Sequence, residues 1–432
     1  MDAAVQDMDF GYLPGSFQSR LPIELHELIV NALDGEEQAL RHCALTCKLY
    51  RPLAQRLLFK HLEINFQSCS DMDPEIFLSI LSHSPHIADY VRRLSYCLHN
   101  SRLPKWDAEP MLAIFSALRN INHLQLSGDR ADLINFFSLE PTLQAMIKLK
   151  CPSVRHLTLA GIIDMPLTVL SACTSLESLD VREVEFANDD CPGSDRGDSK
   201  ASFTHLRRMK ISGIVGQEMQ LICPFMMHST TQGGLESLSI DMGNFGIPVP
   251  FNDLHPVSGI IRNSAKSLKS IDITVTADLP NEALLNVSAM PLLEDISLTG
   301  CIVNFQTTEN RDPINLHWLS RNLETVPSYP SSGRKFRKVL LHSIIVEAKA
   351  VTEEAFDEDS LKQFEDLVLR VISPQTLSLS VKFTIWPGLD DITSAQRAKG
   401  LIRERLHGLH ARKLLELHVP YKSRTSPDIH GL

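Results

Sequence analysis

The stretch LESLDV at residues 176–181 places apolar side chains at Leu176, Leu179 and Val181 and a polar side chain between the last two. Alternation with a period of two residues is typical of a short β-strand that buries one face. The earlier apolar residue then packs at the turn that leads into the strand. The spacing apolar-x-x-apolar-x-apolar therefore predicts a turn and a half-buried strand in these six residues.

The same spacing recurs along most of the chain. It begins at Val91, Ile121, Val154, Leu176, Leu206, Leu235, Leu268, Leu293, Phe336 and Leu414, with a weaker pair at Leu377 and Leu379. Starts from Val91 to Phe336 are roughly 20 to 45 residues apart, the range of repeats that each hold one supersecondary unit. Such a unit buries its apolar face only against its neighbours.

Helix-compatible stretches lie between the strand patterns, at residues 110–118, 133–149, 167–172, 219–227, 254–261 and 281–290. A repeating order of strand, loop, helix and loop predicts an α/β fold, a solenoid with a curved parallel sheet on one side and outer helices on the other. Two segments interrupt the period. Residues 183–202 are predicted to form an exposed loop. Residues 304–334 are predicted to be an insertion that contains a helix near 314–323. Each segment is either a recognition element or a surface without a function.

The strand alternation also predicts which side chains face the core and which face solvent. We expect one continuous core from the pairs Leu157/Leu159, Leu179/Val181, Leu238/Ile240, Ile271/Ile273 and Ile296/Leu298. Their neighbours then face the concave side of the sheet: Gln125, Thr158, Asp180, Lys210, Ser239, Asp272 and Ser297. The charged members Asp180, Lys210 and Asp272 are candidate contacts to a protein substrate. The alternative is an ordinary solvated sheet face.

The first sixty residues follow a helical period instead. Leu25, Leu28, Ile29, Ala32 and Leu33 fall at i, i+3, i+4, i+7 and i+8, which predicts a helix between Pro22 and Gly35. Two more short helices are predicted around 40–47 and 53–61. A unit of about forty residues buries little apolar surface by itself, so we expect it to pack against a partner or against the rest of the chain.

Residues 21–62 resemble an F-box. The matching positions are Leu21, Pro22, Ile23, Glu24 and Leu25, then Ile29, Leu33, residues 43–47, Lys48, Tyr50, Leu53 and Leu57. Tyr50 stands where the family usually has Trp, and residues 35–37 replace an Asp-Leu step found in many members. The resemblance implies docking on a Skp-type adaptor through Leu21, Pro22, Ile23, Leu25, Ile29, Leu53 and Leu57. The alternative is a helical cap on the end of the solenoid.

As a whole, the chain resembles the fungal-type F-box proteins with degenerate leucine-rich repeats. The resemblance implies a substrate-recognition subunit of a Skp-cullin-F-box ubiquitin ligase, with the adaptor, the cullin ligase core and an unspecified protein substrate as partners. The alternative is a leucine-rich-repeat interaction scaffold without a ligase role. The expected organisation is a flexible segment at 1–20, the F-box at 21–62, a helical linker at 63–90, the solenoid at 91–420 and a tail at 421–432.

Composition and missing motifs narrow the function classes. The net charge of -10 has the wrong sign for a nucleic-acid partner, and no apolar run approaches the roughly 20 residues of a membrane span. Phosphate-loop, dinucleotide-binding, zinc-protease and serine-hydrolase motifs are missing from the sequence, so neither an enzyme nor a cofactor is expected. The nine cysteines lack CxxC spacing, which favours a reducing compartment, cytoplasmic and/or nuclear. His42, Cys43 and Cys47 could suggest a metal site, but an apolar helix stripe explains the two cysteines better, so no metal is expected.

Overall fold

The computed structural model describes residues 21–64, 73–98, 108–128, 133–187, 203–213, 222, 226, 234–242, 254–276, 285–302, 316–326, 336–345, 358–371, 378–385 and 392–420. The segments expected to be a flexible N-terminus (1–20) and a C-terminal tail (421–432) lie outside these ranges. Most of the interruptions predicted at 183–202 and 304–334 lies outside them too.

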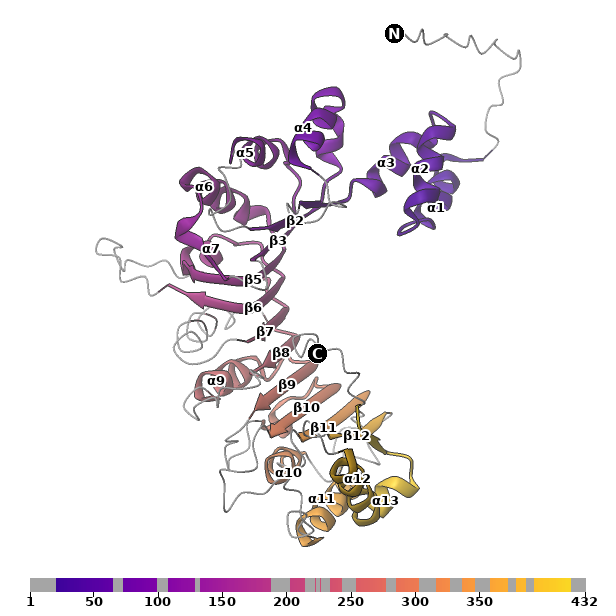
Figure 1. Cartoon of the computed structure of the whole chain (residues 1–432), viewed down its shortest axis with the longest axis vertical. Helices are drawn as coiled ribbons and strands as arrows, with labels where there is room; N and C mark the ends of the chain where they lie inside the picture. The colour runs from indigo at the N-terminus through magenta and orange to yellow at the C-terminus, as the bar shows by residue number, and fades with distance from the viewer. Residues whose placement is uncertain are drawn as a thin grey trace.

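Three helices open the described chain, as the period of the sequence predicted: α1 (Ile23–Asn31), α2 (Glu37–Thr46) and α3 (Tyr50–Leu58). They share a small core of their own, centred on the buried Val30, Leu40 and Ala54. This core is separate from the large one of the sheet. The helical unit stands at one end of the molecule, next to the first strands (Figure 1).

A sheet of 13 strands runs through the described residues, and every strand pair in it is parallel. Each strand pairs with the next along the chain, except that β3 pairs with β5 instead of β4, and β4 pairs only with β5. The strands are β1 (His61–Ile64), β2 (Arg93–Cys97), β3 (His123–Ser127), β4 (Ile134–Asn135), β5 (His156–Met165), β6 (Ser178–Phe186), β7 (Arg208–Ser212), β8 (Ser237–Asp241), β9 (Ser270–Thr276), β10 (Asp295–Ile302), β11 (Lys338–Ile345), β12 (Leu379–Ile385) and β13 (Leu415–His418).

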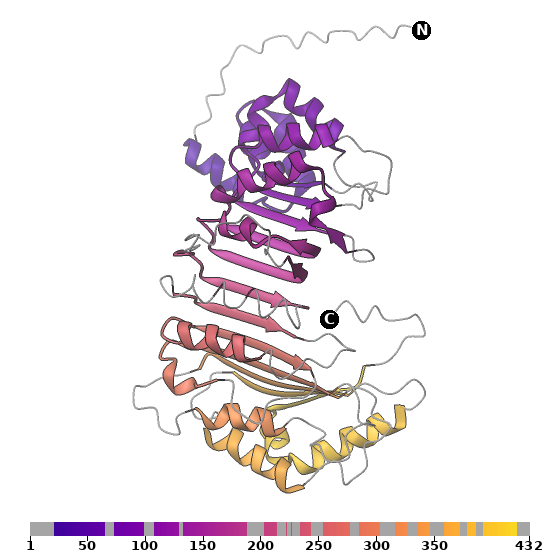
Figure 2. The ribbon, with the colours of Figure 1, turned by 90° about the vertical axis from the view of Figure 1, so that its left-hand side faces the viewer.

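Helices connect the strands and cover one face of the sheet, and the stack curves so that the other face is concave (Figures 1 and 2). This architecture is the predicted α/β solenoid, similar to a leucine-rich-repeat stack. The helices are α4 (Pro74–His83), α5 (Ala108–Ala117), α6 (Pro141–Lys150), α7 (Leu167–Ser171), α9 (Leu254–Ser264), α10 (Leu316–Glu324), α11 (Glu358–Val371), α12 (Ile392–Arg405) and α13 (His407–Ala411), with 3-10 turns at η1 (Pro85–Asp89), η2 (Phe136–Ser138), η3 (Cys151–Ser153) and η5 (Val287–Ala289).

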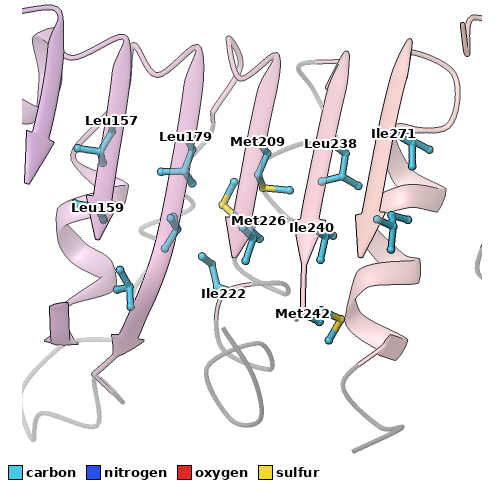
Figure 3. Close-up of a cluster of buried hydrophobic side chains, with 14 of the residues drawn as sticks. Leu157, Leu159, Leu179, Met209, Ile222, Met226, Leu238, Ile240, Met242 and Ile271 are labelled. Carbon is cyan, nitrogen blue, oxygen red and sulfur yellow. The ribbon is translucent and has the colours of Figure 1, made fainter. Parts of the chain in front are cut away.

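The predicted inward pairs form the core that runs through the stack. All ten side chains, from Leu157 and Leu159 to Ile296 and Leu298, are no more than 1% exposed. Figure 3 shows Leu157, Leu179, Met209, Leu238 and Ile271 side by side on successive strands, at positions that the pairing register aligns. The register therefore joins the apolar pairs into continuous rows, which is why each unit depends on the next.

The sheet begins earlier than residue 91. The structure places β1 at the boundary between the expected F-box and helical linker, where Leu62 and Ile64 are buried and pair with Leu94 and Tyr96 of β2. Phe59, Leu62 and Ile64 have the repeat spacing, so the signal was present in the sequence. The segment expected to be a helical linker, 63–90, does contain a helix, α4. This helix packs on the core of the sheet and is therefore part of the solenoid.

Three further expectations need correction. Strand β6 continues to Phe186, because after Arg182 and Glu183, which are both exposed, the buried Val184 and Phe186 resume the alternation within the segment predicted as a loop from residue 183. In β12 the residues aligned with Val339 and Leu341 are Leu379 and Val381, two positions later than the pair Leu377/Leu379. Of the helix predicted at 281–290, the described part holds only η5, whereas the helix predicted near 314–323 is confirmed by α10.

Backbone conformation also repeats along the stack. Gly161, Glu183 and Gly213 occupy the same register position just beyond the fifth residue of β5, β6 and β7, and all three have positive φ, at 63°, 51° and 65°. Gly128 lies beside Gly161, and a Cβ at Gly128 would stand 2.2 Å from the Gly161 carbonyl oxygen. This close backbone approach requires glycine at residue 128.

We expect Gly128→Ala and Gly400→Ala to change stability in opposite directions. The first forces backbone apart and should cost about 2 kcal/mol or more. The second adds a methyl group at an exposed position of α12 with nothing within 4 Å, and should stabilise by about 1 kcal/mol. Thermal unfolding followed by circular dichroism checks both signs. Equal melting temperatures for the two variants would contradict the close approach at Gly128.

Candidate functional site

Helix α1 presents an apolar surface to solvent, here called the α1 surface: Leu21, Ile23, Leu25, Leu28 and Ile29. These residues are between 42% and 64% exposed, whereas His26 of the same helix is only 5% exposed. Large apolar side chains outside and a histidine inside reverse the usual distribution. Exposed apolar side chains gathered on one element are typical of interaction surfaces.

The buried histidine has a specific partner. The Nδ1 atom of His26 lies 3.1 Å from the hydroxyl oxygen of Tyr50, and the two rings meet edge to face at 5.4 Å. Val30 of α1 belongs to the small core, and Leu33, two residues beyond the end of the helix, packs against it. Of the stripe that the sequence period defined, Leu33 therefore faces the core as predicted, whereas Leu25, Leu28, Ile29 and Ala32 are exposed.

The contact between His26 and Tyr50 also brings the junction of α2 and α3 beside α1. Two apolar side chains stand at this junction, Leu45 at 80% exposure and Leu49 at 39%. Leu28, Leu45 and Leu49 were not among the predicted adaptor contacts. An apolar residue at i+3 from Leu25 was a signal for Leu28, but nothing in the period distinguishes Leu45 from a core residue.

The structure separates the predicted adaptor contacts into two groups. Leu21, Pro22, Ile23, Leu25 and Ile29 are all exposed on or beside α1. Leu53 and Leu57 are half-buried and pack against the small core of the helical unit. The first group is therefore accessible at the surface, whereas Leu53 and Leu57 help to hold the helical unit together.

The two cysteines of the helical unit also have structural surroundings. Cys43 packs on the small core, and the Sγ atom of Cys47 accepts the Tyr50 backbone N–H at 3.4 Å, at the start of α3. In the part of the chain that the structure describes, no three His, Cys, Asp or Glu side chains come together as a metal site would require.

The solvent face of the sheet carries polar rows that the pairing register aligns. Gln125, Thr158, Asp180, Lys210, Ser239, Asp272 and Ser297 form one such row, so the three predicted substrate contacts do share a surface. Two of the three are already hydrogen-bonded within the chain. Asp180 accepts from the Arg182 guanidinium at 3.0 Å, and Asp272 accepts from the Ser239 hydroxyl at 3.4 Å.

A second row on the same face was not predicted. His61, Arg93, His123 and His156 stand at paired positions on β1, β2, β3 and β5. The rings of His123 and His156 are 5.5 Å apart, and the Nε2 atom of His61 lies 2.9 Å from the Ser95 hydroxyl. The sequence shows each histidine directly before an apolar strand residue, but only the register brings them side by side.

Burial and positive neighbours lower the pKa of three histidines on this face, His123, His156 and His342. Partial burial, followed by the charges of Arg93, His156 and His61, lowers the pKa of His123 to about 4. Partial burial and Arg208 also lower the pKa of His156. Farther along the sheet, burial and Lys382 lower the pKa of His342 to about 4, against a smaller opposing effect of Glu416.

Charged side chains alternate in sign along the margin where the strands begin: Arg155, Glu177, Arg207, Glu236, Lys269, Glu294 and Arg337. The ion pairs include Lys269–Glu236 at 3.0 Å and Arg155–Glu177 at 3.6 Å, and Arg337 donates to Asp295 at 2.9 Å. Exposed pairs of this kind contribute about 0 to 1 kcal/mol each. From β5 onward, positive and negative charges balance along this margin. At its start, before β1 and β2, Lys60 and Arg92 are both basic.

Comparisons with known proteins bear on the overall shape. No family model matches the chain, and no curated protein matches its sequence. Among solved structures, a chain in the crystal structure of the Rad7 and Elc1 complex in yeast is 14% identical, with a TM-score of 0.33 over 84% of this chain and 88% of that one. The LRR protein LIC12759 of Leptospira interrogans is 10% identical, with a TM-score of 0.26 over 89% and 86%. Likenesses with TM-scores this low identify neither a partner nor a function.

Within the residues that the structure describes, no helix is both long enough and apolar enough to cross a membrane.

The histidine pKa values predict a loss of stability in mild acid. Unfolding returns His123 and His342 to a pKa near 6.5, so the unfolded chain binds more protons below that pH, and stability falls as the pH drops from about 6.5 toward 4. The urea midpoint should therefore be lower at pH 5.5 than at pH 7.5. In the double variant His123→Gln with His342→Gln the drop should be smaller, while Gln125→Ala should retain it. A drop of the same size in all three proteins would refute the assignment.

Proposed function

We propose that the chain is an F-box substrate-recognition subunit of a Skp-cullin-F-box ubiquitin ligase. The observation that supports this proposal is the α1 surface. Five large apolar side chains are exposed there, in the region whose sequence resembles an F-box. Covering an exposed leucine or isoleucine gains about 1.5 to 3 kcal/mol when the burial is complete. The docking partner in this proposal is a Skp-type adaptor, which in turn recruits the cullin ligase core.

The arrangement of the two parts suits this role. Only Phe59 and Lys60 separate α3 from β1, so the helical unit continues directly into the solenoid. Lys60 is paired with Asp34 at 3.1 Å, and the Gln55 side chain lies 3.4 Å from His86 of η1. These contacts connect the adaptor-binding unit to the substrate-binding sheet. In a ligase they would limit how far a bound substrate moves relative to the adaptor.

The second element of the proposal is the concave, solvent-facing side of the sheet, which would bind the protein substrate. Its row of Asp180, Lys210 and Asp272 offers charge pairing and hydrogen bonding, which contribute more to specificity and association rate than to affinity. The proposed role is non-catalytic and is exercised in the cytoplasm and/or the nucleus. Without an adaptor interaction, the same architecture would serve as a repeat scaffold.

The adaptor-docking prediction is tested with Leu25→Ala combined with Ile29→Ala in the full chain. If both act as hot spots of about 2 kcal/mol, the double variant should bind a purified Skp-type adaptor about a thousandfold more weakly, measured by calorimetry or pull-down. Because both side chains are exposed, the melting temperature should not change by more than a degree or two.

Ile76→Ala is the matched control for this test, since Ile76 is 57% exposed on α4, outside the α1 surface. It should bind the adaptor as the unmodified chain does. Undiminished adaptor binding by the double variant would remove the α1 surface from the proposal. A wild-type chain that fails to bind the adaptor would favour the scaffold without a ligase role.

A further inference from the structure

The first strands of the sheet carry a cluster of basic and imidazole groups on their solvent face, here called the histidine–arginine patch: His61, Arg93, His123, His156, Arg208 and Lys210. The first four lie in one register row, and Arg208 continues that row on β7, with Ser178 of β6 between it and His156. Lys210 follows two residues after Arg208 on the same strand and face.

We propose that the histidine–arginine patch binds an anionic peptide segment of the substrate, with carboxylate or phosphate groups lying against Arg93 and Arg208. This inference rests on the proposed role of the chain as a substrate receptor and adds the chemical class of the segment that it recognises. It differs from the earlier hypothesis of a mixed row at Asp180, Lys210 and Asp272, because it places the main contacts nearer the helical unit.

The cations of the patch are available to a ligand. Among the described residues, Arg93, Arg208 and Lys210 form no ion pair. Two acids on neighbouring strands are paired with other cations, Asp180 with Arg182 at 2.5 Å and Glu177 with Arg155 at 3.6 Å. Although the net charge of the chain is -10, three cations without an ion pair to any described residue thus share one surface. Arg is suited to such a site because its guanidinium binds carboxylate and phosphate in a bidentate manner.

The histidines contribute hydrogen bonds and planar surfaces to the patch. With pKa values lowered by their surroundings, His123 and His156 are neutral near pH 7, so each ring has one N–H donor. Arg93 is paired with His61 on one side and with His123 on the other, so its exposed side chain lies between two imidazole-bearing strand positions.

Length and charge favour a peptide over a nucleic acid. The patch from β2 to β7 spans four strand spacings, about 19 Å at about 4.8 Å each, which matches about six extended residues at about 3.3 Å. Beyond β7 the solvent face turns acidic, with Asp241, Asp272 and Asp295 on β8, β9 and β10. A polyanion continuing along the sheet would meet these carboxylates, whereas a short acidic segment ends before them.

The test measures direct binding to the full chain by fluorescence anisotropy. The probe is a labelled peptide of six glutamates with Gly-Ser flanks, compared with the same peptide made of glutamines, a version with three phosphoserines, and a six-nucleotide oligothymidylate. We expect the glutamate or the phosphoserine peptide to bind, more weakly as salt increases, and the glutamine peptide not to bind. The stronger of the two anionic peptides shows whether carboxylate or phosphate is preferred.

The variant is Arg93→Gln with Arg208→Gln, and the matched control is Lys338→Gln with Lys382→Gln, which removes the same charge from the far end of the same face. The first should weaken anionic-peptide binding at least tenfold, and the second less than twofold. Equal weakening by both pairs, or an oligonucleotide that binds more tightly than either peptide, would overturn the proposal. Because no adaptor is present in this assay, its failure is distinct from a failure of adaptor docking, which the Arg93→Gln and Arg208→Gln variant should retain.

Discussion

One hydrogen-bonding step recurs at the start of almost every unit, and the solenoid depends on it. The carbonyl oxygen of the residue before one strand accepts two backbone N–H groups from the start of the next. Lys60 accepts from Arg92 and Arg93 at 3.0 Å each, and Glu236 accepts from Lys269 and Ser270 at 2.7 and 3.0 Å. This step sets the parallel register, and a shift of one residue would turn every apolar side chain to solvent.

The fixed register has consequences on both faces of the sheet. On the inner face it aligns the apolar pairs into one core, so a unit is stable only between neighbours. On the outer face it aligns side chains that are distant in sequence, such as His61, Arg93, His123 and His156, at about 4.8 Å per strand. A surface suited to a ligand therefore results from the same hydrogen bonds that build the core.

The helical unit, unlike the sheet, leaves many of its large apolar side chains exposed. Its own core is small, and α1 directs His26 and Val30 inward while its leucines and isoleucines remain outside. The buried histidine is satisfied by Tyr50, the residue that stands where the resembling family usually has Trp. Burying these exposed side chains against the proposed adaptor would stabilise the unit, and only Phe59 and Lys60 separate α3 from β1 of the sheet.

The sequence by itself determined the class of the fold. The period-two alternation and the helical stretches are local patterns, so they can be recognised in the sequence without knowing any tertiary contact. It also determined the ten inward core residues and the row of Asp180, Lys210 and Asp272, since alternation assigns faces. Even β1 was marked by Phe59, Leu62 and Ile64. Of the exposed apolar residues of α1, Leu25 and Ile29 were predicted as docking residues through a family resemblance, and Leu28 was not.

Only the tertiary structure decided which side of α1 faces the core, because a helix with apolar residues on more than one side has no preferred side until α3 packs against it. It decided that Leu53 and Leu57 belong to the small core and that Leu45 and Leu49 lie outside it. It also decided the histidine–arginine patch. Five strands lie between His61 and Arg208 in the sequence, and pairing between strands, a non-local interaction, brings the two residues onto one surface.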